Sequence, residues 1–211
     1  MELYKQISDA NRIKYGTEAE KILRIIINQY SDRTHFIYEI LQNAEDAGAT
    51  RIQFHLKKEK LVIEHDGRPF NEKDIEGVCG IANGTKEDGT RIGHFGIGFK
   101  SVYCYTEHPY IYSGEYHFVI QNQLFPKEVP GSQEIAYDET CMILPFDKGE
   151  VPSSIAYQEI RDALTKKITA ESIIMLNQIS DVRIEIDGYP EEIEINKAKY
   201  SLDKKAYADN V

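Results

Sequence analysis

The chain has 211 residues, with 25 basic and 35 acidic side chains, a formal net charge of −10 and a hydrophobic content of 41%. This length indicates one domain or two small ones, and the hydrophobic content excludes a wholly disordered chain. Because nucleic-acid backbones are bound by clustered Lys and Arg, the acidic balance argues against direct nucleic-acid binding. It still allows a single phosphate site built from backbone N–H groups.

The three cysteines, Cys79, Cys104 and Cys141, are widely separated. They form neither a disulfide framework nor a CxxC zinc pair, which fits a reducing, cytoplasmic environment. The N-terminal segment lacks the apolar stretch of a signal peptide, and no apolar run is long enough to span a membrane. The scattered histidines show no metal-binding spacing, so we expect no transition-metal site.

Helical patterns come first along the chain. Apolar residues recur at helical spacing over 17–30, and a second helix is predicted from 34 to 47. Ser31 or Asp32 can cap the second helix, and Gly48 ends it.

Two strand-like runs follow, 51–56 and 61–65, joined by a charged turn. Asn71 is a cap for a new helix. The glycine-rich stretch 80–98 is too polar for the core and too long for a tight turn, so we interpret it as a mobile loop. A short helix over 99–105 is predicted after it.

Strands dominate the next part of the chain. The predicted elements are strands at 110–112, 116–121 and 140–146 with a loop at 122–139, a helical region over about 153–178, and a strand at 182–186. This order predicts an α+β fold in which helices cover one face of a mixed, mainly antiparallel sheet. We expect one domain over 1–194 and a polar tail or linker over 195–211.

Three polar residues share one narrow stripe of the predicted helix 34–47. At 100° per residue, Asn43 lies about 40° from Glu39, and Asp46 lies about 20° to the other side. The opposing side is apolar and carries Ile37, Ile40, Leu41 and Ala44. A carboxylate that orients water and an amide that ligates Mg²⁺ would suit hydrolysis. A solvated helix face explains the same stripe, and these residues alone leave both interpretations open.

Asp66 and Gly67 directly follow the predicted strand 61–65. A carboxylate at a strand end can accept a hydrogen bond from an exocyclic amine such as that of adenine, and a glycine lets a flat ring approach the backbone. An ordinary Asp-Gly turn is the alternative.

A glycine-rich turn leads into the short helix. It comprises Gly93, His94, Phe95, Gly96, Ile97, Gly98, Phe99 and Lys100. Backbone N–H groups at such a turn bind phosphate oxygens. The turn matches neither the Rossmann nor the Walker A pattern. Lys100 either assists the phosphates or is a surface lysine, and the surface interpretation is favoured. Thr140 opens a strand, where its hydroxyl would either touch a base or simply belong to a β-branched residue.

In this order, the segments resemble the motifs of the GHKL ATPase superfamily, which includes gyrase, the large heat-shock ATPase chaperone, histidine kinases and MutL. They read YEILQNAEDAGAT (38–50), EHDGRPF (64–70), RIGHFGIGFKSVY (91–103) and ETCMIL (139–144). The sequence is most similar to the sacsin-type ATPase domains. The resemblance covers roughly 17–187 and implies the Bergerat fold, a two-layer α/β sandwich with an ATP lid at about 82–98.

The resemblance implies a role for each matching residue. It implies that Glu39 is the general base, that Asn43 is the Mg²⁺ ligand and that Asp46 is a supporting acidic residue. Counting back two residues from Gly67 reaches a histidine, His65, so Asp66 is assigned to the adenine amine and the register stays open. The remaining nucleotide contacts are assigned to Gly67, the turn Gly93–Lys100, and Thr140.

The function implied by the resemblance is slow, Mg²⁺-dependent ATP hydrolysis by the N-terminal domain of a larger chaperone-like or defence-type protein. ATP would order the lid and drive dimerisation or docking of downstream domains. A nucleotide-sensing module without turnover is an alternative, although Glu39 argues against it. Phosphotransfer to a histidine ranks last, because we find no marked phospho-acceptor helix.

Overall fold

The computed structural model describes residues 2–18, 21, 23–25, 32–81, 98–132 and 135–197. The strands are β1 (Arg51–Lys57), β2 (Lys60–His65), β3 (Tyr110–Ser113), β4 (Tyr116–Gln121), β5 (Phe125–Glu128), β6 (Thr140–Pro145), β7 (Asp181–Ile186) and β8 (Ile193–Asn196). The α-helices are α1 (Glu2–Tyr15), α3 (Phe36–Asp46), α4 (Glu72–Cys79), α5 (Ser153–Lys166) and α6 (Ala170–Ile174), and the 3₁₀ helices are η1 (Gly16–Glu18), η2 (Arg33–His35) and η3 (Gly98–Cys104).

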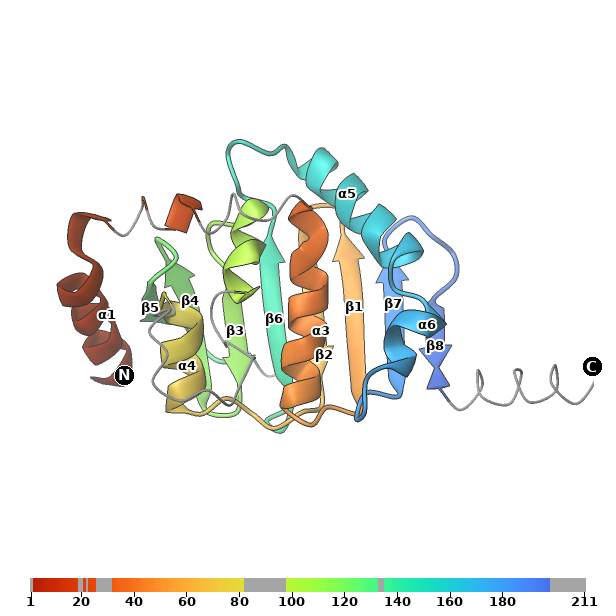
Figure 1. Cartoon of the computed structure of the whole chain (residues 1–211), viewed down its shortest axis with the longest axis horizontal. Helices are drawn as coiled ribbons and strands as arrows, with labels where there is room; N and C mark the ends of the chain where they lie inside the picture. The colour runs from red at the N-terminus through yellow and green to blue at the C-terminus, as the bar shows by residue number, and fades with distance from the viewer. Residues whose placement is uncertain are drawn as a thin grey trace, which may run out of the picture.

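The described strands form one eight-stranded sheet in the order β5-β4-β3-β6-β2-β1-β7-β8. β1 and β7 run parallel, and the other neighbouring strands run antiparallel. The helices lie over one face of this sheet (Figure 1). Alternate residues of β1 and β2 are buried beneath them. The fold is therefore α+β, a two-layer α/β sandwich, as predicted.

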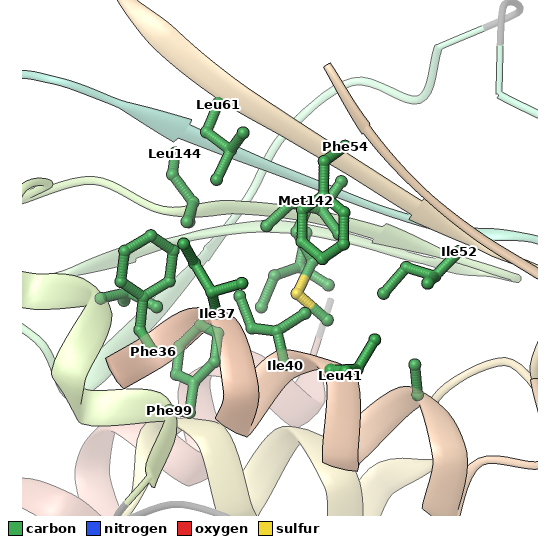
Figure 2. Close-up of a cluster of buried hydrophobic side chains, with 14 of the residues drawn as sticks. Phe36, Ile37, Ile40, Leu41, Ile52, Phe54, Leu61, Phe99, Met142 and Leu144 are labelled. Atoms are coloured by element: carbon green, nitrogen blue, oxygen red, sulfur yellow. The ribbon is translucent and has the colours of Figure 1, made fainter. Parts of the chain in front are cut away.

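α3 packs on the middle of the sheet and builds the centre of the core. Its Ile37, Ile40 and Leu41 point toward strand residues that include Phe54 and Met142 (Figure 2). All five side chains are at most 2% exposed. Burying an aliphatic side chain of this size contributes about 1.5–3 kcal/mol. The apolar side of the predicted helix therefore faces the sheet, as its periodicity indicates.

Local signals mark both ends of the helical segment formed by η2 and α3. The Asp32 carboxylate accepts a hydrogen bond from the Thr34 N–H at 3.0 Å and caps the preceding η2, whereas Ser31 lies outside the described residues. Gly48 ends the helix in the left-handed region, with φ +76°. A side chain is strained in that conformation, which explains the glycine there.

α1 was not predicted from the sequence. Its buried face contains both apolar residues, such as Tyr4 and Ile7, and polar residues, such as Ser8 and Asn11. The Asn11 side-chain amide donates to the carbonyls of Cys79, at 3.1 Å, and Leu124, at 2.8 Å. Such bonds to distant parts of the chain hold α1 in place, so local periodicity gives a weak signal. Most of the predicted helix over 17–30 lies outside the described residues.

β5 lies within the predicted loop 122–139, so that part of the loop prediction was wrong. Its Pro126 lies opposite Ile120 of β4. β5 is the first strand in the sheet order and is therefore an edge strand. A residue without an N–H is tolerated in an edge strand because the outer side of the strand needs no ladder bond.

The predicted helical region 153–178 is two helices. α5 ends at Lys166, and Thr169 starts α6 by accepting a hydrogen bond from the Ser172 N–H. Farther along the chain, β8 pairs with β7 and places Ile195 opposite Val182. The sheet thus continues to Asn196, past the expected domain end at 194, and residues 198–211 lie outside the described part.

In the part of the chain that the structure describes, no helix is long and apolar enough to cross a membrane. The three cysteines are buried free thiols.

A buried carboxylate joins the last turn of α3 to the segment before β7. The Glu45 carboxylate accepts hydrogen bonds from the N–H groups of Asn177, Gln178 and Ile179, the last two at 2.8 and 2.9 Å. Burial would raise the pKa of Glu45, but these three bonds lower it below its usual value. The ionised carboxylate therefore satisfies backbone donors that would otherwise be left unpaired.

Replacing Glu45 by Gln should lower the unfolding free energy by about 1–3 kcal/mol, because the amide turns an NH₂ group toward backbone donors. Asp46→Asn is the matched control, because Asp46 is an exposed neighbour that accepts a bond from Gln42. Its effect should stay within about 0.5 kcal/mol. Denaturant titration measures both variants, and an unchanged midpoint for Glu45→Gln would contradict the bracing role of Glu45.

Candidate functional site

A narrow recess lies between α3, α4 and the adjoining ends of β2 and β6. It is lined by Asn43 and Ala47 of α3, His65, Arg68 and Phe70 of β2 and the turn after it, Asp74 and Val78 of α4, Phe99 of η3, and Met142 of β6. The free space has room for about one water molecule. A larger ligand would enter only if the walls of the recess moved apart.

Three polar residues lie side by side across the covered face of the sheet, and one of them, His65, lines the recess. His65 of β2 and Ser113 of β3 each lie opposite Thr140 of β6. Directly opposed residues share a sheet face, and alternation within β2 places His65 on the covered face with Leu61 and Ile63. The Ser113 and Thr140 hydroxyl oxygens are 2.6 Å apart. The two hydroxyl groups are therefore neighbours of His65 in the sheet, but they lie outside the lining of the recess.

His65 is buried and neutral. Burial lowers the pKa of its imidazole to about 4, although the nearby Asp66 charge acts in the opposite direction. The Gly67 N–H donates to Nδ1 at 3.2 Å. A neutral ring that accepts at Nδ1 carries its proton on Nε2.

Asp66 faces away from the recess. Its carboxylate accepts hydrogen bonds from the N–H and hydroxyl of Thr50, at 2.8 and 2.6 Å, and from the Arg51 N–H at 2.8 Å. Burial would raise the pKa of Asp66, but these bonds hold it below the usual value. The carboxylate fastens the start of β1 to the end of β2. The adenine contact assigned to Asp66 stays a prediction, and His65 is the residue that reaches the recess.

Gly67 packs tightly in the same turn. A methyl group on it would lie 3.0 Å from the Ala47 Cβ and 3.1 Å from the Ala49 N. The glycine thus lets the turn approach the end of α3, beside the recess rather than on its lining.

The predicted polar stripe of α3 divides into different environments. Asn43 lines the recess, and its side-chain amide has no hydrogen-bond partner among the described residues. Asp46 is exposed and accepts a bond from Gln42 at 3.2 Å. The structure therefore brings Asn43, and not Asp46, to the recess.

Glu39 lies where η3 approaches α3. Its Oε1 is 3.0 Å from His35 Nε2. A methyl group on Gly98 would lie 1.8 Å from Glu39 Oε2. A side chain at position 98 would therefore displace this carboxylate from its present position.

The η3 residues differ from their predicted surroundings. Phe99 lines the recess, but the Lys100 ammonium is fully buried and donates to the carbonyls of Val78, at 2.8 Å, and Gln123, at 2.5 Å. Burial lowers the pKa of Lys100 to about 8. The surface interpretation of Lys100 is wrong, because the amine caps backbone groups. The other turn residues, Gly93, His94, Phe95, Gly96 and Ile97, lie outside the described residues.

Sequence reasoning missed an ion pair in the recess wall. Arg68 donates to Asp74 through both terminal nitrogens, at 2.6 and 3.1 Å. Asp74 also caps α4 together with Asn71. The sequence indicated only the helix cap at this position. The contact with Arg68 depends on how the turn between β2 and α4 folds, which a local pattern does not predict. In the described ranges, no group of three His, Cys, Asp or Glu side chains is placed to hold a metal ion.

The fold and the recess together define a structural class, a two-layer α/β sandwich with a recess between its central helix and the sheet. Residues 60–139 match the family model of the Sacsin domain. The chain is 32% identical to human (Homo sapiens) Sacsin over 121 residues, which cover 48% of this chain and 3% of Sacsin. It is 36% identical to Protein NO VEIN of Arabidopsis thaliana over 95 residues, 42% of this chain and 4% of that protein.

Chaperone protein HtpG of Chlorobium phaeovibrioides is 28% identical over 138 residues, 49% of this chain and 22% of HtpG. These matches support a sacsin-type GHKL domain similar to those of heat-shock chaperones, as the motifs predicted. The chain spans less than a quarter of the length of each of these relatives.

Acid should destabilise this domain through His65. Its pKa is about 4 in the folded state against 6.5 ordinarily, so the unfolded chain takes up a proton first as the pH falls. The unfolding free energy should therefore fall between about pH 6.5 and 4, by up to about 3 kcal/mol. Thermal melting of the wild type and His65→Asn across this range measures the difference. Identical pH dependence in the two proteins would contradict the assignment.

Proposed function

We propose that this domain binds ATP with Mg²⁺ and hydrolyses it slowly. One arrangement carries the proposal: Asn43 and His65 line the recess, Glu39 projects from the same helix as Asn43, and the Gly98 backbone lies against Glu39. The likeness to HtpG and to the Sacsin domain supports it.

Asn43 suits a Mg²⁺ ligand. Its amide oxygen is the kind of hard oxygen ligand that Mg²⁺ prefers. The side chain makes no hydrogen bond among the described residues, so this oxygen is available to the ion. Mg²⁺ would neutralise developing charge on the phosphates when bound. Because the recess is narrow, we propose that α3 and α4 separate to admit the base.

Glu39 suits a general base. A water molecule held by its carboxylate would attack the γ-phosphorus, and Glu39 would take the proton. The bond between the γ-phosphorus and the β–γ bridging oxygen would break as the new P–O bond formed, and ADP would leave. His35, 3.0 Å from the carboxylate, would hold it in position. The Gly98 backbone lies against the other oxygen and leaves no room for a side chain beside it.

We propose that turnover is slow in the isolated domain. Arg68 lines the recess, but its guanidinium forms a bidentate pair with Asp74 and would have to break that pair to stabilise the phosphates. A catalytic group would then come from downstream domains of the same protein or from a second copy in a nucleotide-dependent homodimer. A cytoplasmic, chaperone-like setting without membrane or direct nucleic-acid contact belongs to the same proposal.

Asn43→Ala should weaken ATP binding about tenfold or more in the presence of Mg²⁺, because loss of one ligand removes at least about 1.4 kcal/mol. In EDTA, the variant should bind like the wild type. Calorimetric titration measures both conditions, and Asp46→Asn on the same helix is the control. A loss of affinity that is independent of Mg²⁺ would remove Asn43 from the metal site.

Gly98→Ala should slow phosphate release about 10²-fold or more while ATP still binds, because the methyl group would displace the Glu39 carboxylate. Glu39→Gln should have the same phenotype. Gly149→Ala is the matched glycine control, because a methyl group there meets no atom within 4 Å. ATP binding with no phosphate release from the wild type would instead support a nucleotide-sensing module.

A further inference from the structure

The floor of the recess presents a hydrogen-bond donor. His65 is only 3% exposed, and its Nδ1 is already paired with the Gly67 N–H at 3.2 Å. The remaining ring nitrogen, Nε2, carries the proton and has no partner among the described residues. A ligand that reaches this floor therefore meets an N–H group.

The carboxylates near His65 are both engaged by other donors. Asp66 is held by Thr50 and Arg51 on the other side of the strand. Asp74 lines the recess, but its Oδ2 accepts from Arg68 at 2.6 Å and from the Asn71 N–H at 2.8 Å, and its Oδ1 accepts from Arg68 at 3.1 Å. These carboxylates thus leave Nε2–H as a donor, and the Asn43 amide, which also lines the recess, is the group assigned to Mg²⁺.

Purine bases differ at carbon 6, so a buried donor that faces this position would distinguish them. Adenine carries an amine at carbon 6, which is itself a donor, whereas guanine carries a carbonyl oxygen there. A buried donor facing another donor leaves both without a partner, and that is costly. A donor facing a carbonyl oxygen forms a hydrogen bond.

We infer that His65 is the base-reading residue of this site and that, through Nε2–H, it makes the site accept 6-oxopurine nucleotides at least as well as adenine nucleotides. This inference rests on the proposed nucleotide site. It assigns specificity to His65, leaving Asp66 as a structural brace.

The test compares ADP with IDP, which exchanges the amine for a carbonyl oxygen and protonates the adjacent ring nitrogen. Calorimetry with Mg²⁺ uses the full chain and two variants of equal size, His65→Asp and His65→Asn. Both variants keep an oxygen that can accept the Gly67 N–H in an Asx turn. The aspartate then presents an acceptor to the recess, and the asparagine presents a donor.

We expect the wild type and His65→Asn to bind IDP at least as tightly as ADP. His65→Asp should reverse the preference and favour ADP by about tenfold, the effect of one well-placed hydrogen bond. Thermal melting confirms that each variant is folded. If His65→Asp is unfolded, the wild-type preference and His65→Asn still decide the matter.

A wild type that binds ADP tenfold more tightly than IDP would overturn the inference and leave the proposed nucleotide site intact. The same holds if ADP and IDP bind equally in all three proteins, because position 65 would then not read the base. Failure of the wild type to bind ADP, IDP or ATP at millimolar concentration would overturn the proposed function itself, and this inference with it.

Discussion

The packing of α3 against the middle of the sheet is the constraint on which the site depends. Its apolar side is buried against β1, β2 and β6, so rotation of the helix would expose that side to water. The buried face fixes the direction of the opposite one. Glu39 and Asn43 therefore keep fixed directions toward η3 and the recess, although neither contributes much to the core.

The pleat of β2 imposes the second constraint. Successive residues of a strand point to opposite faces, so Glu64 and His65 cannot both face α3, and Asp66, the first residue after the strand, is bonded to Thr50 and Arg51. The pairing of His65 with Thr140 fixes which one does. Asp66 then meets the start of β1 and stabilises the loop after α3. A single register thus decides whether the recess receives an imidazole or a carboxylate.

Buried charges in this domain bind mainly to backbone groups. Glu45 accepts N–H groups before β7, and Lys100 donates to carbonyls at the end of α4 and in the turn before β5. An unpaired buried charge is costly, so these contacts tie helices and sheet into one arrangement. Lys100 fixes η3 close to α4, and Gly98, two residues earlier, lies against Glu39. The same packing that satisfies the lysine therefore also positions the glycine beside the carboxylate.

The sequence by itself determined the elements with strong local signals: α3 with Gly48 after it, Asp32 as the cap of the preceding turn, the β1–β2 pair, Asn71 as a helix cap, and the superfamily resemblance. Periodicity and capping are local properties, so they can be read without the fold. Only the tertiary structure decided that α1 packs on the sheet edge, that Pro126 lies in an edge strand and that Lys100 is buried. It also decided that His65, rather than Asp66, faces the recess, because strand register and contacts between distant segments set these outcomes.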